Sequence, residues 1–233
     1  MINRLVRNMM NEAKQKLTLA EQKAKELFAA VEERGLIAPG KTESELIAEI
    51  VELAKNEFGI DQFWHKKIVR AGANTLQPYS GNPPDVVIQN DDMVIVDFGP
   101  IVDGWEADLG RTYVMGNDPL KLKLKTDIEA ACHEAKAWHT QQYGLTGAAY
   151  FNYLTQLAKK YGWEYGGEIG GHIVGHFPHE QLDPDDLGLD IHPDNHSDIL
   201  QHDPQGNPRH WILEIHFVDR ANNIGGFFEQ LLN

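Results

Sequence analysis

The stretch MVIVDFGPIVDGWEADLGRTYVM, which runs from Met93 to Met115, decides the fold. Its first four residues are apolar and largely β-branched, which predicts a strand that is buried on both faces. That strand leads into Asp97, and a buried carboxylate needs a cation or another partner. After two turn signals a second strand, which contains Asp108, is expected to end at Val114. The pattern predicts a hairpin that brings two acids together, as a divalent metal site requires.

The composition excludes several classes of protein. With 233 residues and 42% hydrophobic content, we expect one domain, residues 1–233, that buries a full core. The net charge of -14 and the lack of a basic cluster argue against nucleic-acid partners. Cys132 is the single cysteine, so an internal disulfide is impossible. Neither a signal sequence nor a membrane-spanning run is evident, so the sequence predicts a cytoplasmic protein without a membrane partner.

The pattern of apolar residues predicts an α/β (α+β) fold. Further strands are expected where β-branched and apolar residues recur, and the expected ranges are 67–71, 211–218 and 225–232. Helices are expected where apolar residues recur at helical spacing or a capping box precedes them, and the expected ranges are 11–34, 43–58, 120–143 and 148–160. This order of elements suggests two similar halves. Residues 183–208 are rich in Asp, Pro, Asn and His, which is typical of a long irregular loop.

Three more residues resemble the first two acids in their setting. Glu214 and Glu229 lie within expected buried strands, and His172 follows a glycine-rich segment in which backbone can approach a site closely. Eight of the eleven histidines lie between His172 and His216. Four carboxylates and an imidazole suit two divalent ions better than one. Such pairs activate water for hydrolysis at a carbonyl or phosphoryl centre.

The order of these residues resembles that of the pita-bread metallopeptidase family, which includes methionine aminopeptidase, aminopeptidase P, prolidase and the metal-free creatinase. The ligand order of that family is Asp, Asp, His, Glu, Glu. Its first two ligands are eleven residues apart, as Asp97 and Asp108 are, and a second histidine follows the third ligand after seven residues, as His179 follows His172. The resemblance extends from about Gln15 to the end of the chain.

The resemblance implies a fold of two pseudo-symmetric halves, with a curved antiparallel sheet and flanking helices. It implies two divalent metal ions (manganese, cobalt, iron or zinc), with Asp97 on one, Asp108 and Glu229 bridging both, and His172 and Glu214 on the other. Glu214 would also handle protons during catalysis, and His179 would donate a hydrogen bond to the scissile carbonyl. The implied activity is the removal of an N-terminal residue from short peptides, and homo-oligomers are compatible with it.

The chain also departs from the family. Peptidases of this family usually carry a histidine seventeen or eighteen residues before the first aspartate, where this chain has Gln77 to Ser80. Phe227 replaces an arginine that aminopeptidase P and prolidase tend to carry. We favour an Xaa-Pro aminopeptidase or dipeptidase. A methionine-aminopeptidase-like enzyme and a metal-binding protein without peptidase activity remain alternatives, and a metal-free amidinohydrolase similar to creatinase is the weakest one.

Overall fold

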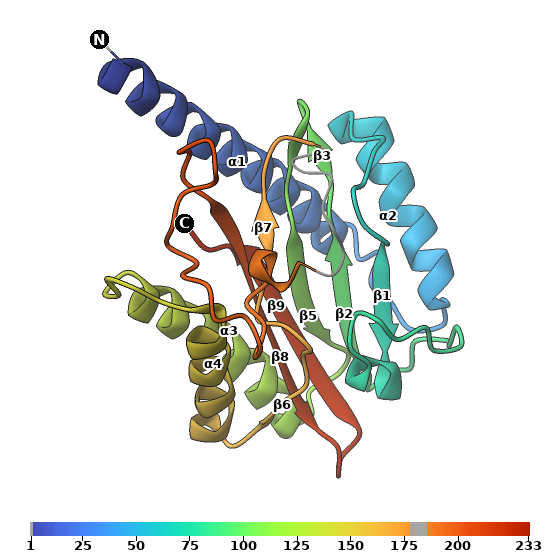
Figure 1. Cartoon of the computed structure of the whole chain (residues 1–233). Helices are drawn as coiled ribbons and strands as arrows, with labels where there is room; N and C mark the ends of the chain where they lie inside the picture. The colour runs from blue at the N-terminus through green and yellow to red at the C-terminus, as the bar shows by residue number, and fades with distance from the viewer. Residues whose placement is uncertain (1, 178–185) are drawn as a thin grey trace.

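One antiparallel sheet forms the centre of the computed structural model, which describes residues 2–177 and 186–233, with side chains from Glu12 onward (Figure 1). The strand order is β1-β2-β5-β9-β8-β6, and β7 pairs with β8 beyond this path. The strands are β1 (Ile68–Ala71), β2 (Met93–Phe98), β5 (Leu109–Val114), β6 (Glu164–Tyr165), β7 (Ile173–Val174), β8 (His210–Asp219) and β9 (Ile224–Leu231). Strand β5, which comes early in the chain, therefore pairs at the middle of the sheet with β9, which comes near the end of the sequence.

The helices form two pairs, one for each half of the sheet (Figure 1). Helices α1 (Ile2–Glu33) and α2 (Glu43–Phe58) share a buried apolar cluster with β1, β2 and β5. Helices α3 (Pro119–His139) and α4 (Gly147–Tyr161) share another with β8 and β9. This is the pita-bread fold that the resemblance implied. That residues 1–233 form a single domain stays a prediction.

Local sequence signals explain how several elements begin and end. Thr42 and Glu45 form the expected capping box at the start of α2. Asp118 caps α3, and Pro119 occupies its first position, where no amide donor is needed. Helix α3 ends at His139, four residues before the expected end, because the amides of Gln141 and Gln142 bond three residues back in a tight turn. Helix α1 begins at Ile2, well before the expected start.

The acid hairpin is more elaborate than predicted. Strands β2 and β5 do pair with each other. In the sequence, however, a small hairpin of β3 (Ile101–Val102) and β4 (Trp105–Glu106) separates them. Asp108 therefore precedes β5, and the expectation that it lies within the strand was wrong. The chain must leave the small hairpin before it can rejoin the main sheet, so this acid lies where the strand begins.

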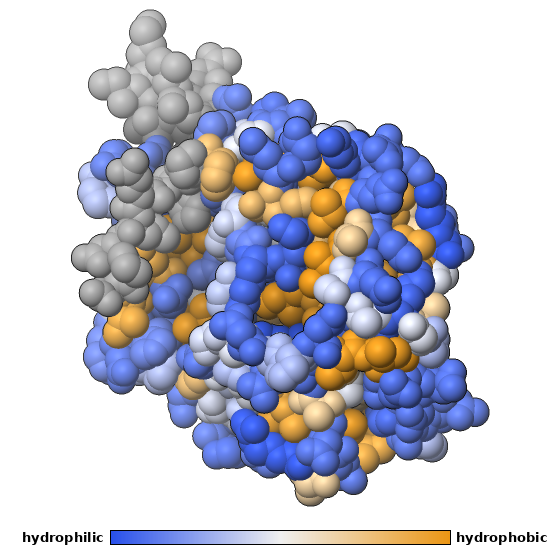
Figure 2. All heavy atoms as spheres, turned by 90° about the vertical axis from the view of Figure 1, so that its right-hand side faces the viewer, coloured by the Kyte–Doolittle hydropathy of each residue, from blue (hydrophilic) through white to orange (hydrophobic). Residues whose placement is uncertain are grey.

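The remaining elements are short. A 3-10 helix, η1 (Gly72–Leu76), follows β1, and another, η2 (Leu187–Leu189), lies in the irregular segment before β8. The face shown in Figure 2 is largely hydrophilic, with hydrophobic atoms in a hollow near its centre. Within the part of the chain that the structure describes, no helix is long and apolar enough to cross a membrane.

Candidate metal centre

The register of the sheet places the predicted acids around one point. Asp97, in β2, pairs with Gly110 of β5, and Gly110 pairs in turn with Glu229 of β9. Glu229 lies directly opposite Glu214 of β8. Like charges directly opposite each other destabilise a sheet unless a cation offsets them. The strand pairing therefore creates a demand for positive charge at the middle of the sheet.

His172 approaches these acids through an unusual backbone segment. Its Nε2 lies 3.2 Å from Asp108 Oδ2 and 3.8 Å from Glu229 Oε1. Gly171 before it has φ +138°, and a Cβ there would lie 2.0 Å from the carbonyl oxygen of Ile212. Only glycine allows this approach, which agrees with the expectation that the glycine-rich segment brings backbone close to the site.

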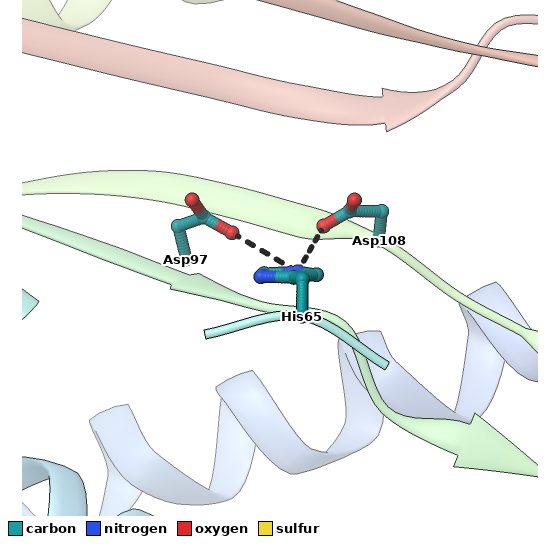
Figure 3. A group of neighbouring side chains, drawn as sticks. All are labelled: His65, Asp97 and Asp108. Atoms are coloured by element: carbon teal, nitrogen blue, oxygen red, sulfur yellow. Dashed lines mark hydrogen bonds and ion pairs between the residues drawn. The ribbon is translucent and has the colours of Figure 1, made fainter. Parts of the chain in front are cut away.

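A second histidine, His65, reaches the same acids and was missed by the sequence analysis. Figure 3 shows its imidazole between the carboxylates of Asp97 and Asp108, and its Nε2 lies 3.6 Å and 3.1 Å from one oxygen of each. His65 lies between α2 and β1, in a segment without a metal-binding spacing. The one signal available in the sequence was that His65 lies just before the expected strand at 67–71, which the structure pairs with β2.

The charges of the two histidines and of Asp108 depend on one another. Burial opposes protonation of His65, but the charges of Asp108 and Asp97 outweigh it and raise its pKa to about 9. Burial likewise opposes protonation of His172, and its bond to Asp108 and the nearby charges raise its pKa to about 9. Burial of Asp108 works against ionisation, yet the two imidazoles hold its pKa below the usual range. Asp108 is therefore the ionised centre of the cluster.

The other three acids are shifted in the opposite direction. Burial raises the pKa of Asp97 to about 7, with the His65 charge opposing this and the Asp108 charge adding to it. Burial, opposed by the His172 charge, raises the pKa of Glu214 to about 8. Glu229 is raised well above the ordinary value by burial and then by Asp108 and Asp97. Four acids cannot all ionise here without more positive charge than two imidazoles supply.

The side chains fit divalent metal ions. Two groups offer ligand atoms within 4.8 Å of one another: His65, Asp97 and Asp108, and Asp108, His172 and Glu229. Asp97 Oδ1 is buried without a hydrogen-bond partner among the residues that the structure describes, and such an orphan oxygen suits a metal ligand. Carboxylates and imidazoles together bind zinc, manganese, iron and related ions. Asp108 belongs to both groups, so it stands where a bridging carboxylate would.

A cavity of about 250 Å³ opens onto these residues. Glu214 lines it, as do Trp64, Tyr79, Asp190 and Phe227. Tyr79 is half exposed, and the centre of its ring is 6.1 Å from that of His65. The loop that lacks the expected histidine thus still lies at the site.

Two other histidines of the histidine-rich segment, His176 and His216, have structural contacts. His216 is buried, and its Nε2 donates a hydrogen bond to the Thr75 carbonyl at 2.7 Å. The ring of His176 packs edge-on against Trp105, with centroids 5.2 Å apart. His179 lies outside the described residues, so its role stays a prediction.

Comparison with known proteins reveals extensive similarity. The sequence profile of metallopeptidase family M24 matches residues 15–203. An Xaa-Pro dipeptidase of Pyrococcus furiosus is 27% identical over 139 residues, which are 60% of this chain and 38% of that protein. An Xaa-Pro dipeptidase of Lactobacillus delbrueckii is 27% identical over 96 residues, 41% of this chain and 26% of that protein.

Solved structures share the fold. A prolidase from Thermococcus sibiricus superposes with a TM-score of 0.74 at 24% identity, covering 94% of this chain and 55% of that chain. A methionine aminopeptidase from Rickettsia prowazekii superposes with a TM-score of 0.68 at 16% identity, covering 95% of this chain and 92% of that chain. The chain thus spans little more than half of the prolidase that it matches and nearly all of the methionine aminopeptidase.

Proposed function

Because the chain belongs to metallopeptidase family M24, we propose that it is a dinuclear-metal exopeptidase that cleaves the N-terminal peptide bond of short peptides. One observation carries the proposal. Asp97, Asp108, His172, Glu214 and Glu229 come from distant parts of the sequence and converge on one cavity. Neither the metal-ion identity nor a cytoplasmic location follows from this geometry, and both stay predictions, as does the oligomeric state.

Divalent ions bound here would polarise the scissile carbonyl and make water acidic enough to attack it near neutral pH. In the proposed arrangement Asp97 would hold one ion, His172 and Glu214 would hold the other, and Asp108 and Glu229 would serve both. A free α-amine of the substrate would be attracted to the same acidic cluster. That attraction would direct cleavage to the first peptide bond.

Glu214 is proposed to be the group that moves protons. Glu214 lines the cavity beside the other acids, so its carboxylate would be placed to take a proton from the attacking water and to pass it to the leaving amine. His179 is proposed to donate a hydrogen bond to the carbonyl oxygen as negative charge develops there. Trp64 and Phe227 line the cavity and would exclude water from the peptide.

We favour peptides with proline in the second position. The support is the similarity to Xaa-Pro dipeptidases of Pyrococcus furiosus and Lactobacillus delbrueckii. A methionine-aminopeptidase-like activity is the second candidate, supported by the superposition on the Rickettsia prowazekii enzyme with a TM-score of 0.68. A binding protein without peptidase activity is the third, motivated by Tyr79 at the place of the expected histidine.

One preparation can test all three candidates. Purified protein is analysed for bound metal and then assayed with matched peptides that carry proline, alanine or an N-terminal methionine. We expect about two equivalents of metal and metal-dependent release of the first residue, fastest for the Xaa-Pro peptides. Selective release of methionine would favour the second candidate. Full metal loading with every peptide left intact would favour the third.

Conservative variants test the assigned ligands. Asp108→Asn and Glu229→Gln should each reduce metal uptake and lower kcat/KM by about a thousandfold or more, because Lewis-acid stabilisation is worth several kcal/mol. Asp91→Asn is the matched control, since Asp91 is an exposed acid whose Oδ2 lies 3.7 Å from Lys121 Nζ. Normal metal uptake by both site variants would show that the ligands are assigned wrongly.

A further inference from the structure

We propose that His65 is itself a metal ligand of this chain, so that each of the two ions has one imidazole. The inference rests on the proposed dinuclear site and adds a residue that the resemblance to the family does not assign. In this arrangement His65 joins Asp97 and Asp108 on one ion, and His172 remains on the other.

The two histidines hold equivalent positions about Asp108. His65 Nε2 lies 3.1 Å from Asp108 Oδ1, and His172 Nε2 lies 3.2 Å from Asp108 Oδ2. Each imidazole thus faces a different oxygen of the same carboxylate. A carboxylate that bridges two ions gives one oxygen to each, so the geometry assigns one histidine to each ion.

The second nitrogen of each ring supports the same role. His65 Nδ1 lies 2.7 Å from the carbonyl oxygen of Lys66, and His172 Nδ1 lies 2.9 Å from that of Ile173. A carbonyl oxygen only accepts hydrogen bonds, so each Nδ1 must carry the proton. In the neutral ring this leaves the Nε2 lone pair free. Metal-binding histidines commonly use such a contact to fix their orientation and tautomer.

The distances on the Asp97 side also suit a shared ion. His65 Nε2 is 3.6 Å from Asp97 Oδ1, the buried oxygen without a hydrogen-bond partner in the described part of the chain. Two ligands that are about 2.1 Å from one ion lie roughly 3.0–3.6 Å apart for angles at the ion of about 90–120°. The side chain of His65 is only 6% exposed. This burial favours an inward-facing ligand over a residue that meets the substrate from solvent.

Hydrogen bonds fix the segment around His65 against the parts of the chain next to Asp97 and Asp108. Two hydrogen bonds fix the position of Trp64. Its backbone amide donates to the Gly99 carbonyl and its Nε1 donates to the Ala107 carbonyl, both at 2.9 Å. A Cβ at Gly99 would lie 2.1 Å from His65 Cδ2 and 2.4 Å from Trp64 Nε1. The absence of a side chain at Gly99 therefore makes room for the imidazole beside Asp97.

Metal binding by His65→Ala tests the inference directly. Metal-free protein is titrated with Co²⁺ and followed by calorimetry and by visible absorbance, which reports the ligands of the ion. For the wild type we expect two equivalents. For His65→Ala we expect the affinity for one of the two Co²⁺ equivalents to fall a hundredfold or more. Part of the visible absorbance should also be lost. X-ray absorption of the fully loaded wild type should require two imidazoles for each pair of ions.

Two further variants keep the result interpretable. His139→Asn is the matched control, because His139 is a buried histidine of α3 that does not line the cavity, and its Co²⁺ binding should equal that of the wild type. His65→Asn retains a polar side chain if the alanine variant fails to fold, and it should show the same loss of metal.

The competing role for His65 is that of a cationic counterion for the two aspartates. A counterion competes with the metal, so its removal should leave Co²⁺ binding unchanged or make it tighter. Either result in a folded His65 variant overturns the inference, whatever number of ions the wild type binds. If Asp108→Asn still loses metal in that case, the proposed dinuclear site stands. A wild type without metal affinity would overturn both proposals.

Discussion

The carboxylates of the candidate site and its imidazoles are positioned by different parts of the structure. Asp97, Glu214 and Glu229 stand within strands, and Asp108 directly precedes one, so strand register determines where they meet. His65 and His172 lie outside the strands of the central sheet and reach the acids through close contacts at glycines. A sheet can thus specify a set of acids by pairing alone, whereas each imidazole needs a backbone built to admit it.

The largest effect should come from Gly171→Ala, which disturbs the backbone segment that positions the imidazole of His172. The added Cβ would lie 2.0 Å from the Ile212 carbonyl oxygen at φ +138°, so the segment before His172 must move. We expect a loss of about 3 kcal/mol or more in the free energy of unfolding, because strain and overpacking add. Urea unfolding measures it.

Gly162→Ala is the control for this prediction. Gly162 ends α4 at φ +88°, with nothing within 4 Å of the added Cβ. It should cost only about 1 kcal/mol, the penalty of a left-handed backbone without a clash. Equal losses in the two variants would mean that the contact at Ile212 has no special weight.

Gly99→Ala should have a smaller effect on stability and a clear effect on metal binding. The added Cβ meets side chains of His65 and Trp64, which can shift, so we expect a cost of about 1–3 kcal/mol in unfolding free energy. Displacement of the His65 imidazole should lower the affinity for one of the two Co²⁺ ions more than tenfold in a titration. In the double variant with His65→Ala, Gly99→Ala should cause little additional loss of affinity. Full additivity would place its effect elsewhere.

The third and most gradual effect is that of pH on the metal-free protein. The pKa values of His65 and His172, both about 9, exceed the ordinary value of 6.5, so their contribution to stability is complete below pH 6.5 and is lost as the pH rises towards 9. Asp97 and Glu214, with pKa values of about 7 and 8, also favour the protonated form and act in the same direction. The depressed pKa of Asp108 lies below this window.

Metal should reverse this trend. Metal ions displace protons from the carboxyl and imidazole groups of the site. The affinity for metal should therefore rise about tenfold per pH unit between pH 7 and 9. Calorimetry in two buffers of different ionisation enthalpy measures the protons released. With chelator present, Tm should fall across the same range. Metal affinity that is flat with pH would indicate that these groups are not the ligands.

Much of the fold followed from local signals in the sequence. The capping box of α2 and the apolar run of β2 were sufficient to predict both elements. The small β3–β4 hairpin was not predicted, because each of its strands has only two residues and lacks an alternating pattern. Its omission put Asp108 inside β5 instead of before it.

The candidate site divided in the same way. Acids in otherwise apolar strands stand out, so Asp97, Glu214 and Glu229 could be found from pattern alone. His65 could not, because its role depends on β1 pairing with β2 and on the space above Gly99, and neither is encoded near it in the sequence. The loop around Tyr79 lacks the expected histidine, and the imidazole of His65 reaches the acids from the segment before β1.

The central position of β9 has a consequence for the order in which the protein assembles. Gly110 of β5 pairs with Glu229 of β9 across more than a hundred residues of chain, so the site exists only after the last strand has entered between β5 and β8. Such long-range closure is entropically costly and tends to come late in folding. Ions that join Asp108 to Glu229 would act as a clasp on the finished molecule. They would slow its opening far more than they would speed its formation.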